Sequence, residues 1–113
     1  MSSEESVEFL LPRMLPNKRL QKSNTIDNLW LYILSLLKER KVYAWEIPVI
    51  IEKRFNFKPG RITPYRVLYR LEKEGFVKSN IKERRRFYQI TEKGNKELGR
   101  GKIFLNKLLK TIK

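Results

Sequence analysis

The sequence predicts a mainly α-helical protein with one small β-hairpin, which is an α+β fold class. Apolar residues recur at helical spacing in four separate segments of the chain. Two short stretches, at about 77–81 and 87–90, instead alternate between apolar or aromatic and polar residues, as half-buried strands do. The 113 residues are enough for one small domain with one core, but few for two.

Positive charge dominates the composition and narrows the choice of partner. Lysine and arginine total 26 against 12 acidic residues, which gives a net charge of +14. An excess of this size usually indicates a polyanion partner, either nucleic acid or an anionic membrane. Most of it lies in the second half of the chain, where residues 58–91 carry +7 and residues 92–113 carry +5. No apolar run is long enough to span a bilayer, and the acidic start Ser2-Ser3-Glu4-Glu5 is unlike a secretory signal.

The chain contains no cysteine and no histidine. This absence excludes disulfides, zinc fingers, thiolate chemistry and imidazole catalysis. The acidic residues are scattered over charged faces. The glycines, at positions 60, 75, 94, 99 and 101, fit turn, cap or helix-break positions better than a phosphate-binding loop. We therefore expect that the protein is not an enzyme and has no cofactor and no metal site.

Residues 1–24 are expected to form an N-terminal arm. Pro12 and Pro16 forbid one long helix, yet the segment between residues 7 and 15 is too apolar for an ordinary disordered tail. Two interpretations are equally acceptable. The arm lies on the domain or on a partner subunit, or it is a loose extension whose apolar residues rest in the nearest groove.

Two helices are expected in the first part of the domain that follows. The first runs over about 26–40 and is apolar over so wide an arc that we expect it to be buried from two sides. A dimer partner is one candidate for the second side. The second helix starts at residue 44 or 45 and ends near residue 55, with Pro48 in its first turn, where proline is tolerated.

A third helix, expected from about Thr63 to Glu74, is the candidate recognition element. Thr63 followed by Pro64 matches an N-cap with proline at the first helical position, and Gly75 matches a C-terminal stop. The helical wheel separates an apolar face from a basic and aromatic face. The apolar face holds Val67, Leu68 and Leu71, and the other holds Arg66, Tyr69, Arg70 and Lys73, with Tyr65 on its flank.

The two strands are joined by a basic turn at residues 82–84, and Thr91 is placed to cap a last helix that reaches towards Lys113. The apolar stripe of that helix has a spacing near 3.5 residues and comprises Leu98, Leu105, Leu108, Leu109 and Ile112. Such a stripe is either core or a dimer interface, and we favour the dimer interface. Gly99 and Gly101 are expected to weaken the helix near its start.

This order of helix, strand, basic turn, strand and helix outlines a winged helix-turn-helix. From the first helix to Gly94, the chain resembles the PadR-like transcription regulators. One shared motif comprises Tyr65, Leu68, Leu71, Glu72, Gly75, Phe76 and Val77. A second comprises Arg85, Arg86, Phe87, Tyr88, Ile90, Thr91, Glu92, Lys93 and Gly94, and a weaker one is Tyr43-Ala44-Trp45-Glu46-Ile47. The chain departs from the family at Ala44, Trp45 and Pro64, where glycine, tyrosine and leucine are usual.

The resemblance implies a winged helix domain over 25–91, followed by a dimerisation helix over 92–113. It implies a homodimeric, sequence-specific regulator that binds double-stranded DNA, is cytoplasmic, and is associated with the nucleoid when bound. The helix at 63–74 would enter the major groove, and the wing at about 81–87 would reach the backbone or the minor groove. The candidate DNA-binding residues are Arg61, Thr63, Tyr65, Arg66, Tyr69, Arg70, Lys73, Lys82, Arg84, Arg85 and Arg86.

Strand geometry restricts how the wing residues are used. Because successive strand residues point to opposite faces, the arginines at 84–86 are not all expected to reach DNA in the same way. We expect contacts from Arg84 and from either Arg85 or Arg86. Tyr88 and Ile90 share one face and are expected to lie in the core.

Other interpretations stay open. A basic winged helix also suits structured RNA, or DNA packaging with little sequence preference. Trp30, Tyr32 and Trp45 are candidates to line a pocket for a small-molecule effector, although aromatic residues at helical spacing are more often core or interface, so such an effector is unsupported. The sequence leaves open the operator, the regulated genes, and whether the protein represses or activates.

Overall fold

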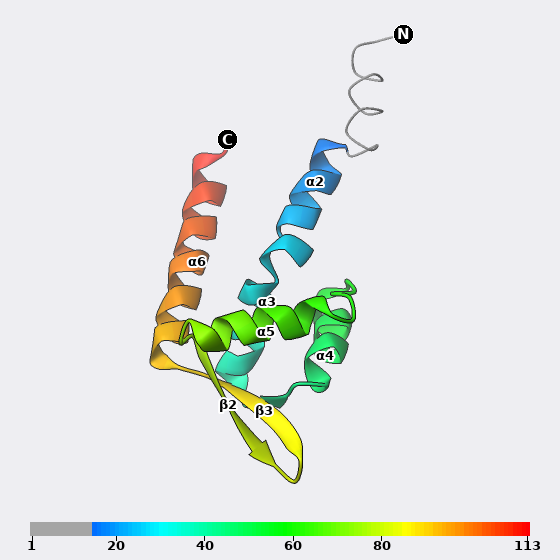
Figure 1. Cartoon of the computed structure of the whole chain (residues 1–113). Helices are drawn as coiled ribbons and strands as arrows, with labels where there is room; N and C mark the ends of the chain where they lie inside the picture. The colour runs from blue at the N-terminus through cyan, green and yellow to red at the C-terminus, as the bar shows by residue number, and fades with distance from the viewer. Residues whose placement is uncertain (1–14) are drawn as a thin grey trace.

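The computed structural model describes residues 15–113 and confirms a mainly helical fold with a small antiparallel sheet (Figure 1). The elements are α2 (Pro16–Ser23), the short 3-10 helix η1 (Ile26–Asn28), α3 (Leu29–Glu39), β1 (Val42–Tyr43), α4 (Glu46–Phe55), α5 (Thr63–Lys73), β2 (Val77–Lys82), β3 (Arg85–Ile90) and α6 (Glu92–Thr111). Of the predicted N-terminal arm, residues 1–14 lie outside the described range, and residues 16–23 form α2.

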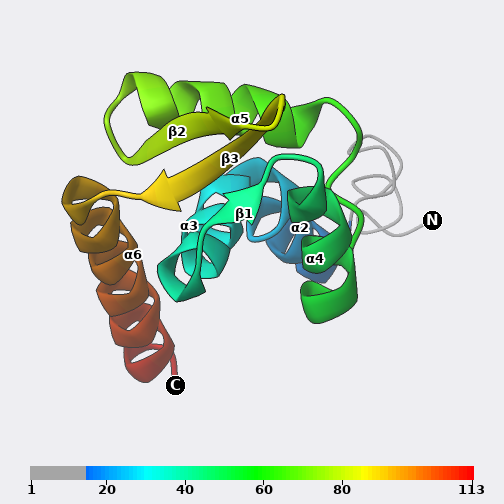
Figure 2. The same cartoon turned by 90° about the horizontal axis from the view of Figure 1, so that it is seen from below.

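The sheet has three strands, whereas the sequence indicated two. β3 lies between β2 and β1, and both neighbours are antiparallel to it (Figure 2). In β1, Val42 is paired with Tyr88 and Tyr43 with Phe87. Two residues are too few to show an alternating pattern, which is why the sequence did not reveal β1.

One predicted helix start and one predicted cap were wrong, and another predicted cap is confirmed. Residues 26–28 form η1, and α3 begins only at Leu29 because Asn28, with φ −129° and ψ 45°, is not helical. Thr63 lies in the first turn of α5 and does not cap it; Ile62 precedes the helix without a capping side chain. Thr91 does cap α6, since its Oγ1 accepts a hydrogen bond of 3.1 Å from the Gly94 amide.

Helix α3 forms the centre of the core. Its buried residues are Leu29, Ile33, Leu34, Leu36 and Leu37. The helix contacts α4, α5, α6 and β3, which confirms burial from more than one side. The chain itself therefore covers both sides, so the dimer partner suggested for the second side is not needed there. Tyr88 is also buried, as predicted, and Ile90 packs against the same core.

Only the first half of α6 is anchored in the core. Gly94 and Leu98 are buried, whereas residues 102–113 are all exposed. α6 continues through Gly99 and Gly101 without a break. A Cβ atom at Gly101 would lie 3.0 Å from Cη2 of Trp30, so the missing side chain lets α6 approach α3 closely. The far half of α6 and helix α2 extend from the same side of the molecule, away from the β2–β3 hairpin (Figure 1).

None of the helices formed by residues 15–113 combines the length and apolar character that crossing a bilayer requires.

Candidate nucleic-acid interface

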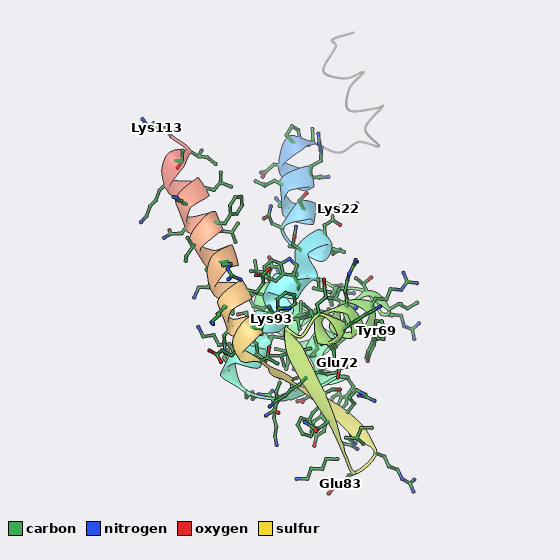
Figure 3. The ribbon with its side chains drawn as sticks, turned by 60° about the vertical axis from the view of Figure 1, so that its left-hand side comes forward. Lys22, Tyr69, Glu72, Glu83, Lys93 and Lys113 are labelled. Atoms are coloured by element: carbon green, nitrogen blue, oxygen red, sulfur yellow. The ribbon has the colours of Figure 1, made fainter. Side chains whose placement is uncertain are left out.

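Helix α5 separates a buried face from a fully exposed one. Pro64, Leu68 and Leu71 are buried against the core. The outer face carries the predicted basic and aromatic residues Arg66, Tyr69, Arg70 and Lys73, all of them exposed. Tyr69 is 68% exposed and points away from the body of the protein (Figure 3). Within residues 15–113 this face of basic and aromatic side chains is exposed, and such a face suits a nucleic-acid backbone and base edges.

The end of α5 fixes the start of the hairpin. Gly75, with φ 85°, is in the left-handed region. Its amide donates to the Glu72 carbonyl at 3.0 Å, and the Phe76 amide donates to the Leu71 carbonyl at 2.8 Å. These two bonds form a Schellman motif, which ends the helix and turns the chain directly into β2. The predicted C-terminal stop at Gly75 is therefore confirmed.

The β2–β3 hairpin is the wing, and a two-residue turn forms its tip. Glu83 and Arg84 both have positive φ, 53° and 66°, as a type I′ turn requires. Lys82 is paired with Arg85 and Ile81 with Arg86, so Arg85 and Arg86 point to opposite faces of the sheet, as strand alternation predicted. Glu83 lies at the tip, far from the helical body (Figure 3). The wing cations Lys82, Arg84, Arg85 and Arg86 are all exposed.

A chain of hydrogen bonds connects the wing to α5. The Ser79 hydroxyl donates to Oε2 of Glu72 at 2.6 Å, and the Arg86 guanidinium donates to the Ser79 oxygen at 2.7 Å. Burial raises the pKa of the neighbouring Tyr88 phenol, and the negative charge of Glu72 raises it further. The two hydrogen bonds join α5, β2 and β3, and we call the three residues that form them, Glu72, Ser79 and Arg86, the wing latch. The sequence did not reveal the latch, because it depends on the strand register.

The remaining predicted DNA-binding residues lie around α5. Arg61 is exposed in the loop before the helix, and Thr63 is half-buried in its first turn. Tyr65, on the flank of the basic face, is 46% exposed. Arg70 lies 4.0 Å from Glu74, and because both side chains are exposed, this ion pair contributes little to the stability of the fold. Arg66 and Lys73 form no ion pair with any residue in the range 15–113.

Most of the predicted interface residues line a groove. Residues of α2, including Leu20, line one side of a groove of about 900 Å³, and the other side is lined by Leu105, Leu108 and Leu109 of α6 and by Ile112, which follows the helix. Leu109 is 73% exposed and Leu20 is 61% exposed. Leu98 was wrongly grouped with them: it is buried in the core of its own chain, because α6 rests on α3 at that level. Ile103 and Phe104, which the sequence analysis did not single out, are exposed as well.

The three aromatic residues considered for an effector pocket do not meet. Tyr32 packs edge-on against Phe55 and Phe57, with ring centroids 4.7 and 5.0 Å away. Trp30 lies by α6, and Trp45 is 56% exposed. The three residues therefore form no shared pocket, and Trp30 and Tyr32 pack against the core, which is the interpretation that the sequence favoured. Nor do acidic side chains within residues 15–113 gather in a group of three that would hold a metal ion.

Comparison with known proteins identifies relatives of this fold. The sequence profile of the transcriptional regulator PadR-like family matches residues 33–100. A transcriptional regulator from Clostridium thermocellum is 33% identical, with a TM-score of 0.68, over 74% of this chain and 87% of that one. A PadR family transcription regulator from Clostridium difficile is 27% identical, with a TM-score of 0.66, over 74% and 92% of the two chains.

A third structure shows the same fold at lower identity. Bacillus subtilis PadR in complex with operator DNA is 23% identical, with a TM-score of 0.60, over 67% of this chain and 47% of that one. Among curated proteins, none matches the sequence.

Proposed function

Because this chain belongs to the PadR-like family of transcriptional regulators, we propose that it acts as a homodimer that binds a specific sequence of double-stranded DNA. Helix α5 enters the major groove, and the wing follows the backbone or the minor groove beside it. The observation that supports this proposal most directly is the outer face of α5, which is basic, aromatic and exposed along its whole length.

The residues of this face have different roles in the proposal. Arg66 and Arg70 reach base edges, where arginine pairs with guanine through two hydrogen bonds. Arg61 and Thr63, at the start of the helix, lie near phosphate. Tyr65 and Tyr69 donate hydroxyls to phosphate or contact thymine methyl groups.

The wing adds charge to the same interface. Lys82, Arg84 and Arg85 supply cations for the backbone, and Lys73 does so from the end of α5. Arg86 has a further role, because it donates to the Ser79 hydroxyl, which in turn donates to Glu72 of α5.

Dimerisation in this proposal occurs along the groove between α2 and α6. A groove of about 900 Å³ lined by exposed leucine side chains is unfavourable in water, and a second copy of the chain offers the same two helices in return. The leucine-rich half of α6 would have no use in a monomeric RNA-binding protein. A two-fold dimer places two recognition helices about 34–36 Å apart on the DNA.

Selection from a random pool of duplexes, followed by sequencing, tests the DNA proposal. We expect a palindromic motif, and we expect Arg66→Ala and Arg70→Ala each to weaken binding by about 1–3 kcal/mol and to relax specificity at one position. Arg19→Ala is the control, because it removes the same charge from exposed α2. Salt-sensitive binding without a motif would instead indicate an architectural DNA-binding protein, and tighter binding to RNA hairpins would indicate an RNA-binding protein.

Light scattering of two matched variants tests the dimer. Ile112 in the groove and Ile81 in the wing are both 64% exposed. We expect Ile112→Asp to shift the protein towards monomer, since it places a charge in the interface, and Ile81→Asp to leave the mass unchanged. A wild-type monomer at micromolar concentration would contradict the proposed assembly.

A further inference from the structure

The sheet has a face turned away from the core, and the residues on it are basic, polar or aromatic. Tyr88 is buried, and Ser79 bonds to Glu72 of α5, so both point inward. Because successive strand residues alternate, the register places their neighbours on the opposite side, here called the outer sheet face. Its residues are Tyr43, Lys78, Asn80, Lys82, Arg85, Phe87 and Gln89. Three of these seven residues are cations, and none is acidic.

A fourth cation, Lys41, is held over the outer sheet face. Lys41 precedes β1, and its Nζ lies 4.8 Å from the centroid of the Phe87 ring. Tyr43 packs edge-on against the same ring, with the two centroids 6.0 Å apart. A cation–π contact positions an ammonium group without neutralising its charge. Lys41 is therefore placed above the central strand and keeps its positive charge.

The cations of this face are not neutralised by carboxylates within residues 15–113. Those that are exposed and form no ion pair in this range are Lys41, Lys78, Lys82 and Arg85. Glu46, which follows β1, has other partners: its carboxylate accepts a hydrogen bond of 2.9 Å from the Tyr43 amide and lies 3.7 Å from Arg40. Glu83 belongs to the turn at the tip of the wing. The face therefore has an excess of positive charge.

The backbone of a nucleic-acid duplex suits such a face. Lys78 and Lys82 are four residues apart in β2, so their Cα atoms are roughly 13 Å apart, in a row. Duplex DNA carries one negative charge per about 1.7 Å of its axis, which is denser than the charge of an extended acidic peptide. The half-buried Phe87 ring already contacts Lys41, so it is not a free platform on which single-stranded bases could stack.

This duplex would not be the one that α5 reads. α5 packs on the inward side of the sheet, where Glu72 bonds to Ser79. Figure 2 shows β2 beside α5 and β1 farther from it. The molecule measures 31 and 25 Å in its two shorter directions, whereas the persistence length of DNA is about 50 nm. One duplex therefore cannot follow both surfaces without sharp bending.

We propose that the outer sheet face binds the backbone of a second DNA duplex, without sequence preference, so that the protein bridges two duplexes. The bridging rests on the proposed function, because α5 holds the first duplex. Lys82 and Arg85 lie near the tip of the wing and also serve the first duplex in that proposal. Lys41 and Lys78 are used only by the outer sheet face, so they distinguish the two surfaces.

Capture of a second duplex tests the bridging. The full chain is bound to an immobilised duplex that carries its selected motif, and a fluorescent duplex of random sequence is added at several salt concentrations. We expect the wild-type chain to capture it. The double variant Lys41→Ala/Lys78→Ala should capture it more weakly, with the slope of log affinity against log salt reduced by about 2, and should bind the motif duplex unchanged. Normal binding of the motif duplex without capture of the second would overturn this inference and leave the proposed function intact.

Two controls test the surface and the partner. Lys102→Ala/Lys110→Ala removes the same charge from exposed positions of α6 that do not line the groove, and it should leave the slope unchanged. An equal loss of capture in both double variants would indicate a general effect of charge and would overturn the assignment to the outer sheet face. Poly-glutamate at matched charge should displace the second duplex poorly. Displacement as effective as that by unlabelled duplex would show that the face takes acidic peptides instead.

Amide NMR signals separate failure of one surface from failure of the other. The variant Arg66→Ala/Arg70→Ala weakens the proposed reading face of α5. We expect a random duplex still to shift the amide signals of Lys78 and Gln89 saturably in this variant. Signals that stay in place would overturn the binding site on the outer sheet face. If these signals shift but no motif can be selected with the wild-type chain, the result counts against the proposed function alone.

Discussion

Gly94 and Gly99 both belong to α6 but have different surroundings. A Cβ atom at Gly94 would lie 2.1 Å from the Phe76 carbonyl oxygen, whereas a Cβ atom at Gly99 would meet nothing within 4 Å. We expect Gly94→Ala to lower the free energy of unfolding by about 3 kcal/mol, since the backbone must move. Gly99→Ala should raise it by about 0.5–1 kcal/mol through helix propensity. Urea denaturation measures both, and equal effects would contradict this account of α6.

The wing latch gives a second prediction for single residues. Ser79→Ala removes the hydroxyl that bridges Glu72 and Arg86, and we expect the free energy of unfolding to fall by about 1–2 kcal/mol. Asn80→Ala is the control, because Asn80 is the next residue of β2 and points to the opposite face. Thermal unfolding of the two variants distinguishes them. A loss of stability in Asn80→Ala as large as that in Ser79→Ala would indicate a general effect of strand propensity.

Single residues also show what the sequence made predictable. The outer face of α5 was predicted because helical periodicity places Arg66 and Arg70 opposite Leu68 and Leu71. The role of Ser79 was not predictable, since its partners are seven residues away on each side and meet it only through the strand register. Leu98 was misplaced because the stripe on α6 continues from core to surface without a change in residue type.

Among the elements, the wing has a turn whose sequence does not suit its backbone. Glu83 adopts a left-handed conformation that costs a residue with a side chain roughly 1 kcal/mol. We therefore expect Glu83→Gly to stabilise the protein by about that amount, and Glu83→Gln to have little effect because it removes only the charge. Chemical denaturation provides the comparison. Equal stabilisation by both variants would show that charge and not backbone conformation limits the turn.

Some helices and strands were predicted from the sequence more accurately than others. α5 was placed within one residue of its observed end because Pro64 and Gly75 mark its limits. The start of α3 was missed because η1 continues the same apolar pattern before the chain turns at Asn28. β1 was missed because its pairing with β3 is a tertiary contact of a two-residue segment.

The charge of the whole molecule predicts a steep salt dependence of DNA binding. A dimer that contacts roughly 6–10 phosphates should lose about 10³–10⁵-fold in affinity between roughly 50 and 200 mM salt. If Arg84 contacts phosphate in both subunits, Arg84→Ala should reduce the slope of log affinity against log salt by about 2. Titrations at several salt concentrations measure this slope. An unchanged slope would place Arg84 away from the backbone.

For the molecule as a whole, the sequence indicated the winged helix and a basic surface for a polyanion partner, but not the arrangement of the terminal helices. The placement of α2 opposite α6 depends on how η1 redirects the chain, which no local pattern encodes. The groove between them became visible only in three dimensions.

Because α6 is anchored in the core at one end only, a small rotation at that end moves the other end much further. Gly94 and Leu98 hold its base, and the exposed remainder of this 20-residue helix extends outward. A helix of that length is about 30 Å long, so a tilt of about 10° at the base moves the far end by about 5 Å. In a dimer joined along α6, that displacement changes the distance between the two recognition helices. Small adjustments where α6 meets α3 and α5 would therefore set how well the protein matches the helical pitch of its DNA.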